Sequence, residues 1–309
     1  MKVDVVIPVY KPTKKLVQII KMLHKQTVKV NKLILINTEK QFFDEFFSES
    51  DMLDQYDDIV IKHISSKEFN HGATRRMGVE MSDADYFICM TDDAVPMNDT
   101  LVEELVGPLE KGIAVVSYAK QCVGDECTEI ERFTRKFNYP DESRLKSKRD
   151  LERLGIKTYF CSNVCAAYNR EIYEKLDGFI DNTIFNEDMI FAAKVIKAGY
   201  SIYYSAEAKV KHYHIYSNMQ QLRRNFDLGV SQADHPEVFK DVPSTTEGKK
   251  MVAETAKHLA KKGMYGKVFS LVVTSGFKYI GYQLGKHYKM IPKGIIMKIT
   301  MNKMYWRKA

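Results

Sequence analysis

The chain has 309 residues, of which 45% are hydrophobic and 28% are charged, the composition of an ordinary globular protein. This length suits one large domain with an appendage, or two domains. The net charge of +7 is uneven, because residues 255–309 hold twelve Lys or Arg and no Asp or Glu, which leaves 35 basic and 40 acidic side chains in residues 1–254. No uncharged apolar run is long enough to span a membrane, which argues against an integral membrane protein.

The first ninety residues alternate between short apolar runs and amphipathic stretches. This order predicts an α/β fold, with a mostly parallel sheet covered by helices on both faces. Ligands bind beyond the carboxyl ends of the strands in such sheets, so the residues that follow each strand are candidates for a site. The predicted strands are Val3–Val9, Leu33–Ile36, Ile59–Ile64 and Tyr86–Met90, and the predicted helices are Lys14–Gln26, Phe42–Phe47 and Ala73–Met81.

The second half of the chain is less regular. We expect Cys122–Asp150 to be rich in loops, and Ser231–Lys250, with its prolines and hydroxyl residues, to be a linker. A linker there would separate a domain of residues 1–240 from a tail of residues 241–309. The other predicted elements are strands at Ile113–Tyr118, Ser201–Tyr204 and Lys209–Tyr213, an extended segment at Phe160–Tyr168 and a helix at Glu187–Ala198.

The cysteines and the N-terminus bear on the compartment. Five cysteines form no CxxC pair, and the first residues lack the organisation of a signal peptide. An odd count of cysteines without a secretory signal predicts reduced thiols in a cytoplasmic protein.

Asp92 and Asp93 come directly after the fourth predicted strand. A carboxylate at this edge of the sheet can hold Mg²⁺ or Mn²⁺, which neutralises the charge of a diphosphate leaving group. Pairs of aspartates are common, however, and an equal alternative is that this pair caps the strand or opens the turn before Pro96.

A second acidic pair, Glu187-Asp188, opens a predicted helix. A carboxylate at a helix start is favoured by the helix dipole whatever its role, so capping is the simplest interpretation. As a catalytic group, Asp188 could accept the proton of an incoming hydroxyl, and Glu187 is its main rival for that role.

His212 and His214 are two residues apart on a predicted strand, so their side chains point the same way. They could ligate the cation or contact phosphate. In the segment before the third helix, Gly72 could let the backbone approach a ligand and Arg75 could pair with phosphate. An ordinary transition from loop to helix is the alternative there.

Taken in order, these motifs resemble the family-two glycosyltransferases, which have the GT-A fold, a Rossmann-like nucleotide-sugar-binding domain. Three of the segments look more narrowly like the rhamnosyltransferase branch. The resemblance covers about the first three quarters of the chain. It rests on Val5–Tyr10, Asn70–Gly78, Thr91–Pro96, Ser162-Asn163, Gly178-Phe179, Glu187-Asp188, Ala198–Tyr200 and Val210–His214.

The resemblance implies a site for the nucleotide-sugar donor. Pro8, Val9 and Tyr10 would line the nucleotide pocket, and Asp92 would lie beside the ribose or the sugar. Asn37, which stands where many relatives carry an Asp, can hydrogen-bond a base. The donor site would also include Asn70, Gly72 and Arg75.

The remaining roles concern the metal and the reaction. Asp93 would bind Mg²⁺ or Mn²⁺, and because Thr91 replaces the first carboxylate of the usual DXD motif, the site would need His212, His214 or the donor's phosphates as further ligands. Asp188 would be the general base. The sugar or acceptor would lie near Ser162, Asn163 and Glu187.

The tail at 255–309 mixes lysines with apolar and aromatic residues at helical spacing. This pattern predicts amphipathic helices that lie on an anionic membrane surface. A helical appendage packed on the catalytic domain is the alternative, and nucleic-acid binding is a third interpretation that we do not favour.

We therefore expect an inverting, metal-dependent glycosyltransferase on the inner face of a cell membrane. It would move L-rhamnose from dTDP-β-L-rhamnose to a hydroxyl of a lipid-linked saccharide, in the synthesis of a bacterial surface polysaccharide. The alternatives are a UDP-hexose or UDP-N-acetylhexosamine donor, or a non-catalytic nucleotide-sugar-binding or scaffold protein. A nucleotide-binding oxidoreductase is disfavoured because no GxGxxG follows the first strand.

Overall fold

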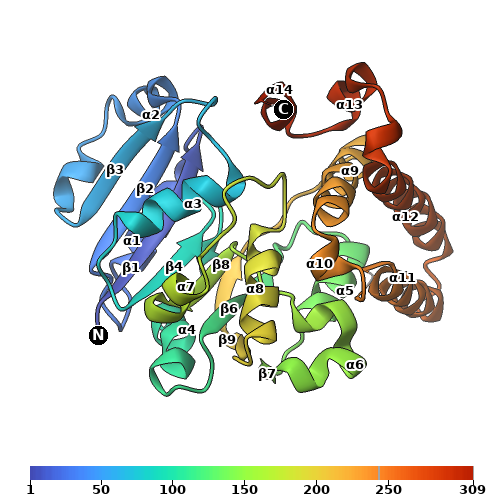
Figure 1. The fold of residues 1–309 in the computed structure, drawn as a ribbon, viewed down its shortest axis with the longest axis horizontal. Helices are drawn as coiled ribbons and strands as arrows, with labels where there is room; N and C mark the ends of the chain where they lie inside the picture. Colours follow the sequence, from blue (N-terminus) through green and yellow to red (C-terminus); the bar gives the residue numbers. More distant parts are fainter. Residues whose placement is uncertain (243, 309) are drawn as a thin grey trace.

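A computed structural model describes residues 1–242 and 244–308 of the chain. In this part of the chain, nine strands form one sheet, in the order β3-β2-β1-β4-β8-β6-β9-β5, with β7 also paired to β9 (Figure 1). The strands are β1 (Val3–Tyr10), β2 (Lys32–Thr38), β3 (Ile59–Ile64), β4 (Tyr86–Met90), β5 (Val95–Pro96), β6 (Val116–Cys122), β7 (Arg144–Lys146), β8 (Cys165–Asn169) and β9 (Ile202–Lys211).

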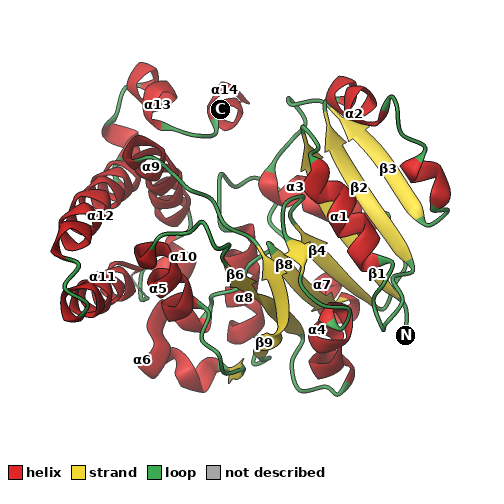
Figure 2. Ribbon diagram, turned by 180° about the vertical axis from the view of Figure 1, so that it is seen from behind, coloured by secondary structure: helices red, strands yellow, loops and turns green. Residues whose placement is uncertain are grey.

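Helices lie on both faces of the sheet, and further helices gather at the end where the chain finishes (Figure 2). Short 3₁₀ turns occupy Met52–Gln55, Lys148–Asp150, Gly155–Thr158 and Tyr288–Met290. The α-helices are α1 (Lys14–Leu23), α2 (Lys40–Phe47), α3 (His71–Glu80), α4 (Leu101–Glu110), α5 (Glu129–Asn138), α6 (Leu151–Leu154), α7 (Arg170–Lys175), α8 (Glu187–Lys197), α9 (Asn218–Asp234), α10 (Pro236–Phe239), α11 (Ser244–Lys261), α12 (Tyr265–Lys286), α13 (Lys293–Ile299) and α14 (Lys303–Lys308).

The first four strands in space, β3, β2, β1 and β4, are parallel. Alternate residues of β1 enter two separate hydrophobic cores, with Val6 in the core beneath α3 and α8, and Val5 and Ile7 in the core beneath α1 and α4. A strand buried on both faces needs a continuous apolar run, which is the pattern that the sequence shows there. The predicted α/β class is confirmed, as are β3 and β4 at their predicted bounds.

Beyond β4 the sheet is mixed, because β8 runs antiparallel to both β4 and β6, while β6 and β9 are parallel. The two strands predicted at Ser201–Tyr204 and Lys209–Tyr213 are one strand, β9. Its pairing with β6 shifts register between Ala119 and Lys120, where β9 has additional residues. Such a bulge interrupts the alternation of side chains without ending the strand, which explains the error.

Two segments predicted to be irregular are helical. Cys122–Asp150 contains α5, which begins with a capping box between Thr128 and Glu131. Its apolar residues Ile130, Phe133 and Phe137 have helical spacing, but most of the helix is polar or charged and none of its residues is fully buried. The expected linker Ser231–Lys250 contains the end of α9, all of α10 and the start of α11; Pro243 lies outside the described residues. The domain boundary at 240/241 stays a prediction.

The predicted C-terminal extension is helical, and its helix α12 packs against α9. Helix α12 meets α9 at two glycines: a Cβ atom at Gly281 would lie 2.1 Å from the carbonyl oxygen of Leu222, and one at Gly285 would lie 2.1 Å from that of Phe226. The chain then returns over α9, where Asp227 accepts hydrogen bonds from the Thr300 hydroxyl and from two backbone amides. Small residues let the two helix backbones approach closely, so the glycines position the whole extension.

Gly285→Ala should therefore destabilise the protein by about 1–3 kcal/mol, because the new Cβ forces the two helices apart. Gly276→Ala on the same helix is the matched control. A Cβ there meets no atom within 4 Å, so this variant should be neutral or more stable by about 0.5–1 kcal/mol. Urea unfolding followed by circular dichroism measures both. Equal unfolding midpoints for the two variants would contradict the close helix contact.

Candidate active site

The carboxyl ends of β1, β2 and β4 lie at one edge of the sheet, as the sequence predicts. Asp92, just after β4, accepts a hydrogen bond from the backbone amide of Tyr10 at the end of β1, at 3.2 Å. Burial, with the neighbouring Asp93 charge, raises the pKa of Asp92 to about 6. The acidic pair is therefore built into the edge where ligands bind in such sheets.

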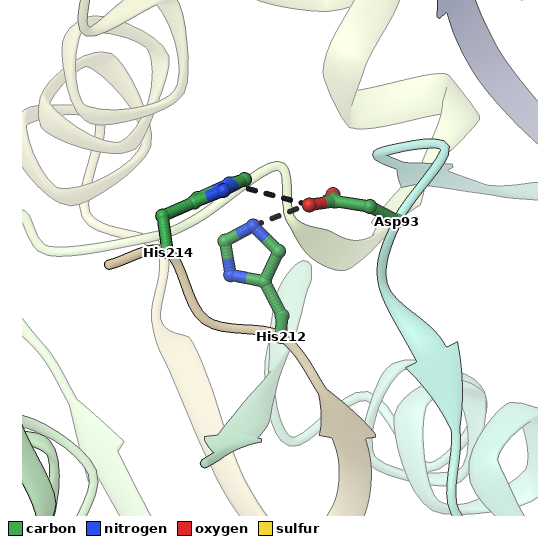
Figure 3. A group of neighbouring side chains, drawn as sticks. All are labelled: Asp93, His212 and His214. Atoms are coloured by element: carbon green, nitrogen blue, oxygen red, sulfur yellow. Dashed lines mark ion pairs between the residues drawn. The ribbon is translucent and has the colours of Figure 1, made fainter. Parts of the chain in front are cut away.

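Asp93, His212 and His214 form a cluster whose candidate ligand atoms all lie within 4.8 Å of one another (Figure 3). His212 Nε2 lies 3.4 Å from Asp93 Oδ1, and His214 Nε2 lies 3.2 Å from Asp93 Oδ2. Both histidines follow the end of β9, where their spacing of two residues turns both rings toward the carboxylate. The three predicted metal ligands are thus brought together.

The hydrogen bonds around His212 define which of its two ring nitrogens carries the proton. Gln121 Oε1 accepts a hydrogen bond from Arg135, so this atom is the amide oxygen, and it lies 3.2 Å from His212 Nδ1. An oxygen can only accept, so Nδ1 carries the proton and Nε2 presents its lone pair. The remaining amide group of Gln121 donates to Ser162 Oγ at 3.0 Å, which holds Gln121 in this orientation.

This arrangement fits a divalent cation. Burial lowers the pKa of His212 to about 4 and also lowers the pKa of His214, so both imidazoles are neutral near pH 7. The lone pair of His212 Nε2 then faces a carboxylate oxygen of Asp93, and a cation between these two acceptors satisfies both. Carboxylate oxygens and neutral imidazole nitrogens are both common ligands of divalent cations in proteins.

Asp188 lies at the first turn of α8 and accepts two backbone hydrogen bonds. Asn163 N donates to Oδ2 at 3.0 Å and Met189 N donates to Oδ1 at 2.7 Å. Burial, and after it the charge of Glu187, nevertheless raises the pKa of Asp188 to about 7. A carboxyl group that titrates near neutral pH can take up a proton during a reaction and release it afterwards.

Glu187 has a different environment, although it is the adjacent residue. Its side chain is buried and forms an ion pair with Arg75 at 3.1 Å, and it accepts a hydrogen bond from Asn163 Nδ2 at 3.2 Å. Burial acts to raise the pKa of Glu187, but Arg75 and His71 outweigh it and the pKa lies below its usual value. Glu187 therefore stays ionised and paired, and Asp188 is the better candidate for a base.

Several residues predicted to contact the donor or the acceptor have structural roles. Asn70 caps α3 by accepting a hydrogen bond from Gly72 N at 3.0 Å. A Cβ atom at Gly72 would lie 1.7 Å from the Ile180 carbonyl oxygen, so only glycine fits there. Arg75 is buried in its ion pair rather than open to a phosphate. The buried Asn163 accepts from Tyr168 Oη at 2.7 Å. These structural roles account for the residues even if no ligand binds to them. Their contacts with a donor or an acceptor stay predictions.

At the nucleotide side, Tyr10 is half exposed and its ring meets Phe42 edge to face at 5.8 Å. Pro8 is partly exposed, whereas the Val9 side chain is buried in the core, so only the backbone of Val9 can line a pocket. Asn37 Nδ2 lies 3.0 Å from His63 Nδ1, and Asn37 Oδ1 is buried with no partner among the described residues. A buried acceptor without a partner is available to a ligand's donor group.

Sequence reasoning missed Gln121, Arg135 and His63. Gln121 lies near the carboxyl end of β6, at the edge of the sheet where ligands bind. Correct bounds for this strand would have made Gln121 a candidate. Arg135 lies on α5, which was predicted as a loop although Thr128-Glu-Ile-Glu131 has the spacing of a capping box. No local signal marks His63, because its partner Asn37 comes from the neighbouring strand.

Gln121→Leu should weaken the binding of Mn²⁺ by about 10–100-fold, because it removes the group that holds His212 Nδ1–H. Isothermal titration of the metal-free protein with Mn²⁺ alone measures this. Gln18→Leu, on the exposed face of α1, is the control and should bind as the unaltered chain does. An unchanged affinity for Gln121→Leu would contradict the role assigned to this residue.

Comparisons with known proteins identify the family of this chain. Residues 4–177 match the model of glycosyl transferase family 2. The chain is 35% identical over 308 residues to O-antigen chain rhamnosyltransferase RfbN of Salmonella typhimurium strain LT2, covering 99% of this chain and 96% of the relative. It is 38% identical over 246 residues to O-antigen chain rhamnosyltransferase WbaN of Salmonella anatum, covering 79% and 78%.

Solved structures show the same fold at low sequence identity. A mannosyltransferase, PcManGT from Pyrobaculum calidifontis in complex with GDP-Man and Mn²⁺, superposes with a TM-score of 0.56 at 12% identity, over 99% of this chain and 85% of that one. S. aureus TarS 1–349 in complex with UDP-GlcNAc gives a TM-score of 0.51 at 12% identity, over 94% and 92%. With its GT-A fold, its matching family model and its relatives along nearly the whole chain, this protein belongs to glycosyl transferase family 2 and is a glycosyltransferase.

Proposed function

We propose that the enzyme transfers L-rhamnose from dTDP-β-L-rhamnose to a hydroxyl of a lipid-linked saccharide, with inversion at the anomeric carbon. The rhamnosyl group is supported by two relatives at 35% and 38% identity, both named as O-antigen chain rhamnosyltransferases. The observation that carries the catalytic assignment is the pair of adjacent residues Ser162 and Asn163. Ser162 is linked through Gln121 to His212, and Asn163 donates to Asp188.

Asp188 is the proposed general base. With a pKa of about 7, it can remove the proton of the acceptor hydroxyl as that oxygen attacks the anomeric carbon. The new glycosidic bond forms on the face opposite the departing nucleotide diphosphate, so one displacement converts a β donor into an α-L-rhamnoside. The transition state has oxocarbenium character. Glu187, paired with Arg75, stays ionised, and its charge adds to the effect of burial that raises the pKa of Asp188.

Asp93, His212 and His214 would hold a divalent cation, Mn²⁺ or Mg²⁺. When bound, this cation supplies the positive charge that neutralises the leaving diphosphate. Gln121 keeps the lone pair of His212 Nε2 directed at the cation position. Tyr10 and Asn37 would contact the nucleobase and Asp92 the ribose or sugar, since all three lie at the same edge of the sheet.

We propose further that the basic residues 255–309 hold the enzyme at an anionic membrane surface on the cytoplasmic side, where a lipid-linked acceptor would lie. Their twelve cations and absence of acids support this. Among the described residues, no helix combines the length and the apolar character needed to cross a bilayer. Attachment would then rest on the surface of the protein rather than on a spanning helix.

The deciding experiment is a screen of dTDP-, UDP- and GDP-sugars with Mn²⁺ or Mg²⁺, in which donor hydrolysis and transfer are both measured. We expect dTDP-β-L-rhamnose to be turned over fastest, with activity lost on exhaustive chelation. Preference for a UDP-hexose or UDP-N-acetylhexosamine would replace the donor assignment. Failure of every donor would favour a non-catalytic binding protein.

Asp188→Asn should bind the donor with unchanged affinity and transfer at least about 10³-fold more slowly, because the amide cannot accept the proton. Asp57→Asn, at an exposed turn, is the matched control and should retain full activity. Equilibrium binding of the donor and initial transfer rates separate the two effects. Near-normal turnover by Asp188→Asn would rule out this residue as the base.

The pH dependence follows from the same residue. Asp188 must be deprotonated to act, and its pKa is raised to about 7, so kcat/KM should be level above pH 7 and fall about tenfold per pH unit below it. The profile is measured at saturating Mn²⁺, with metal occupancy checked at each pH. A rate that stays constant from pH 5 to pH 8 would exclude a base with this pKa.

A further inference from the structure

Helix α12 presents its large apolar side chains to the outside of the molecule. Figures 1 and 2 both place this helix at the outer edge, on the side away from β3. Five of its apolar residues, which we call the outer face of α12, are between 53% and 73% exposed: Tyr265, Phe269, Val272, Tyr279 and Ile280.

The spacing of these residues places them in one stripe. Steps of four, three, seven and one residues along an α-helix keep all five side chains within about a third of a turn. The stripe is therefore continuous, apart from Gly276, along most of a helix of 22 residues. Contiguous apolar surface of this kind marks a site of interaction.

The opposite side of α12 contacts the protein through two glycines, the buried Leu271 and several polar groups. Gly281 and Gly285 pack on the α9 backbone, the Thr274 hydroxyl donates to Asn218 Oδ1 at 2.8 Å, and burial lowers the pKa of Lys278. A surface helix usually turns its large apolar side chains inward, whereas α12 leaves five of them on its outward side. The apolar outer face is thus not explained by packing within the chain.

The charge around this face indicates what it contacts. Lys261 precedes the helix, and Lys286 and Lys289 lie at its end, within a segment of twelve cations and no acids. Two copies of the chain joined face to face would bring these cations together, which opposes association. An anionic lipid surface instead offers acyl chains to the aromatic and aliphatic residues and negative headgroups to the lysines.

We propose that the outer face of α12 inserts into the interface of an anionic bilayer, with the helix lying in the membrane plane. This inference rests on the membrane attachment put forward under the proposed function and identifies the residues that make it. Phe269 and Tyr265 are the principal anchors, because they are the most exposed members of the stripe. The lysines at the two ends of the helix provide the preference for anionic lipid.

The test is flotation of the full chain with vesicles of phosphatidylcholine, with or without 30% phosphatidylglycerol. Phe269→Ser/Val272→Ser should bind anionic vesicles about tenfold or more weakly, since two apolar side chains lose their burial. Leu145→Ser, 44% exposed on β7, is the matched control and should bind as the unaltered chain does. Circular dichroism confirms that the variants are folded.

Donor hydrolysis by the same variants, in solution without vesicles, keeps this test separate from the proposed activity. We expect it to be unchanged by the double substitution. Full retention of vesicle binding by Phe269→Ser/Val272→Ser would overturn the proposal. A chain that is dimeric in light scattering and becomes monomeric with this substitution, while never binding vesicles, would show that the face joins two copies and would overturn it as well.

Discussion

The segment that leads into β8 joins the two halves of the candidate active site. Ser162 accepts from Gln121, which orients His212, and Asn163 donates its backbone amide to Asp188. Asn163 is in turn held by the Tyr168 hydroxyl within β8, and the backbone amide of Thr91 donates to Val164 O beside β4. Because β8 is hydrogen-bonded to β4, which Asp93 follows, the proposed metal ligand Asp93 and the proposed base Asp188 are both tied to these two strands. Small displacements of reacting groups cost large factors in rate, so the proposed mechanism depends on these contacts.

The neighbouring carboxylates Glu187 and Asp188 show how one helix start supplies two different states of the same chemical group. Glu187 is buried against Arg75 and remains charged. Its charge and the burial of the site hold the pKa of Asp188 near neutrality. Removing Arg75 would leave a buried charge without a partner, which is costly, so the ion pair with Arg75 supports the environment of the proposed base. The two carboxylates are neighbours in the sequence, so their positions alone do not show which one can act as a base. Their hydrogen-bond and ion-pair partners in the structure do distinguish them.

Helix α9 connects this site to the C-terminal extension. Ser231 donates to the carbonyl oxygen of Phe185 and accepts from Asn186 Nδ2, which fixes the turn before α8. Four residues earlier on the same helix, Asp227 holds the returning chain at Thr300. The C-terminal extension therefore packs on the rest of the enzyme. This packing does not exclude contact of the extension with a membrane. Gly281 and Gly285 of α12 pack closely on α9, and the five residues of the outer face of α12 lie on the opposite side of the helix.

The sequence by itself determined the first half of the sheet, the candidate metal ligands and the acidic helix start. These are local patterns: a strand buried on both faces must be apolar throughout, and residues after parallel strands share one edge. Only the tertiary structure decided that β9 continues through a bulge, that Gln121 and Arg135 orient His212, and that Arg75 turns inward to Glu187. Each of those outcomes depends on partners far away in sequence, and side-chain burial and hydrogen bonding are set by such partners rather than by neighbouring residues.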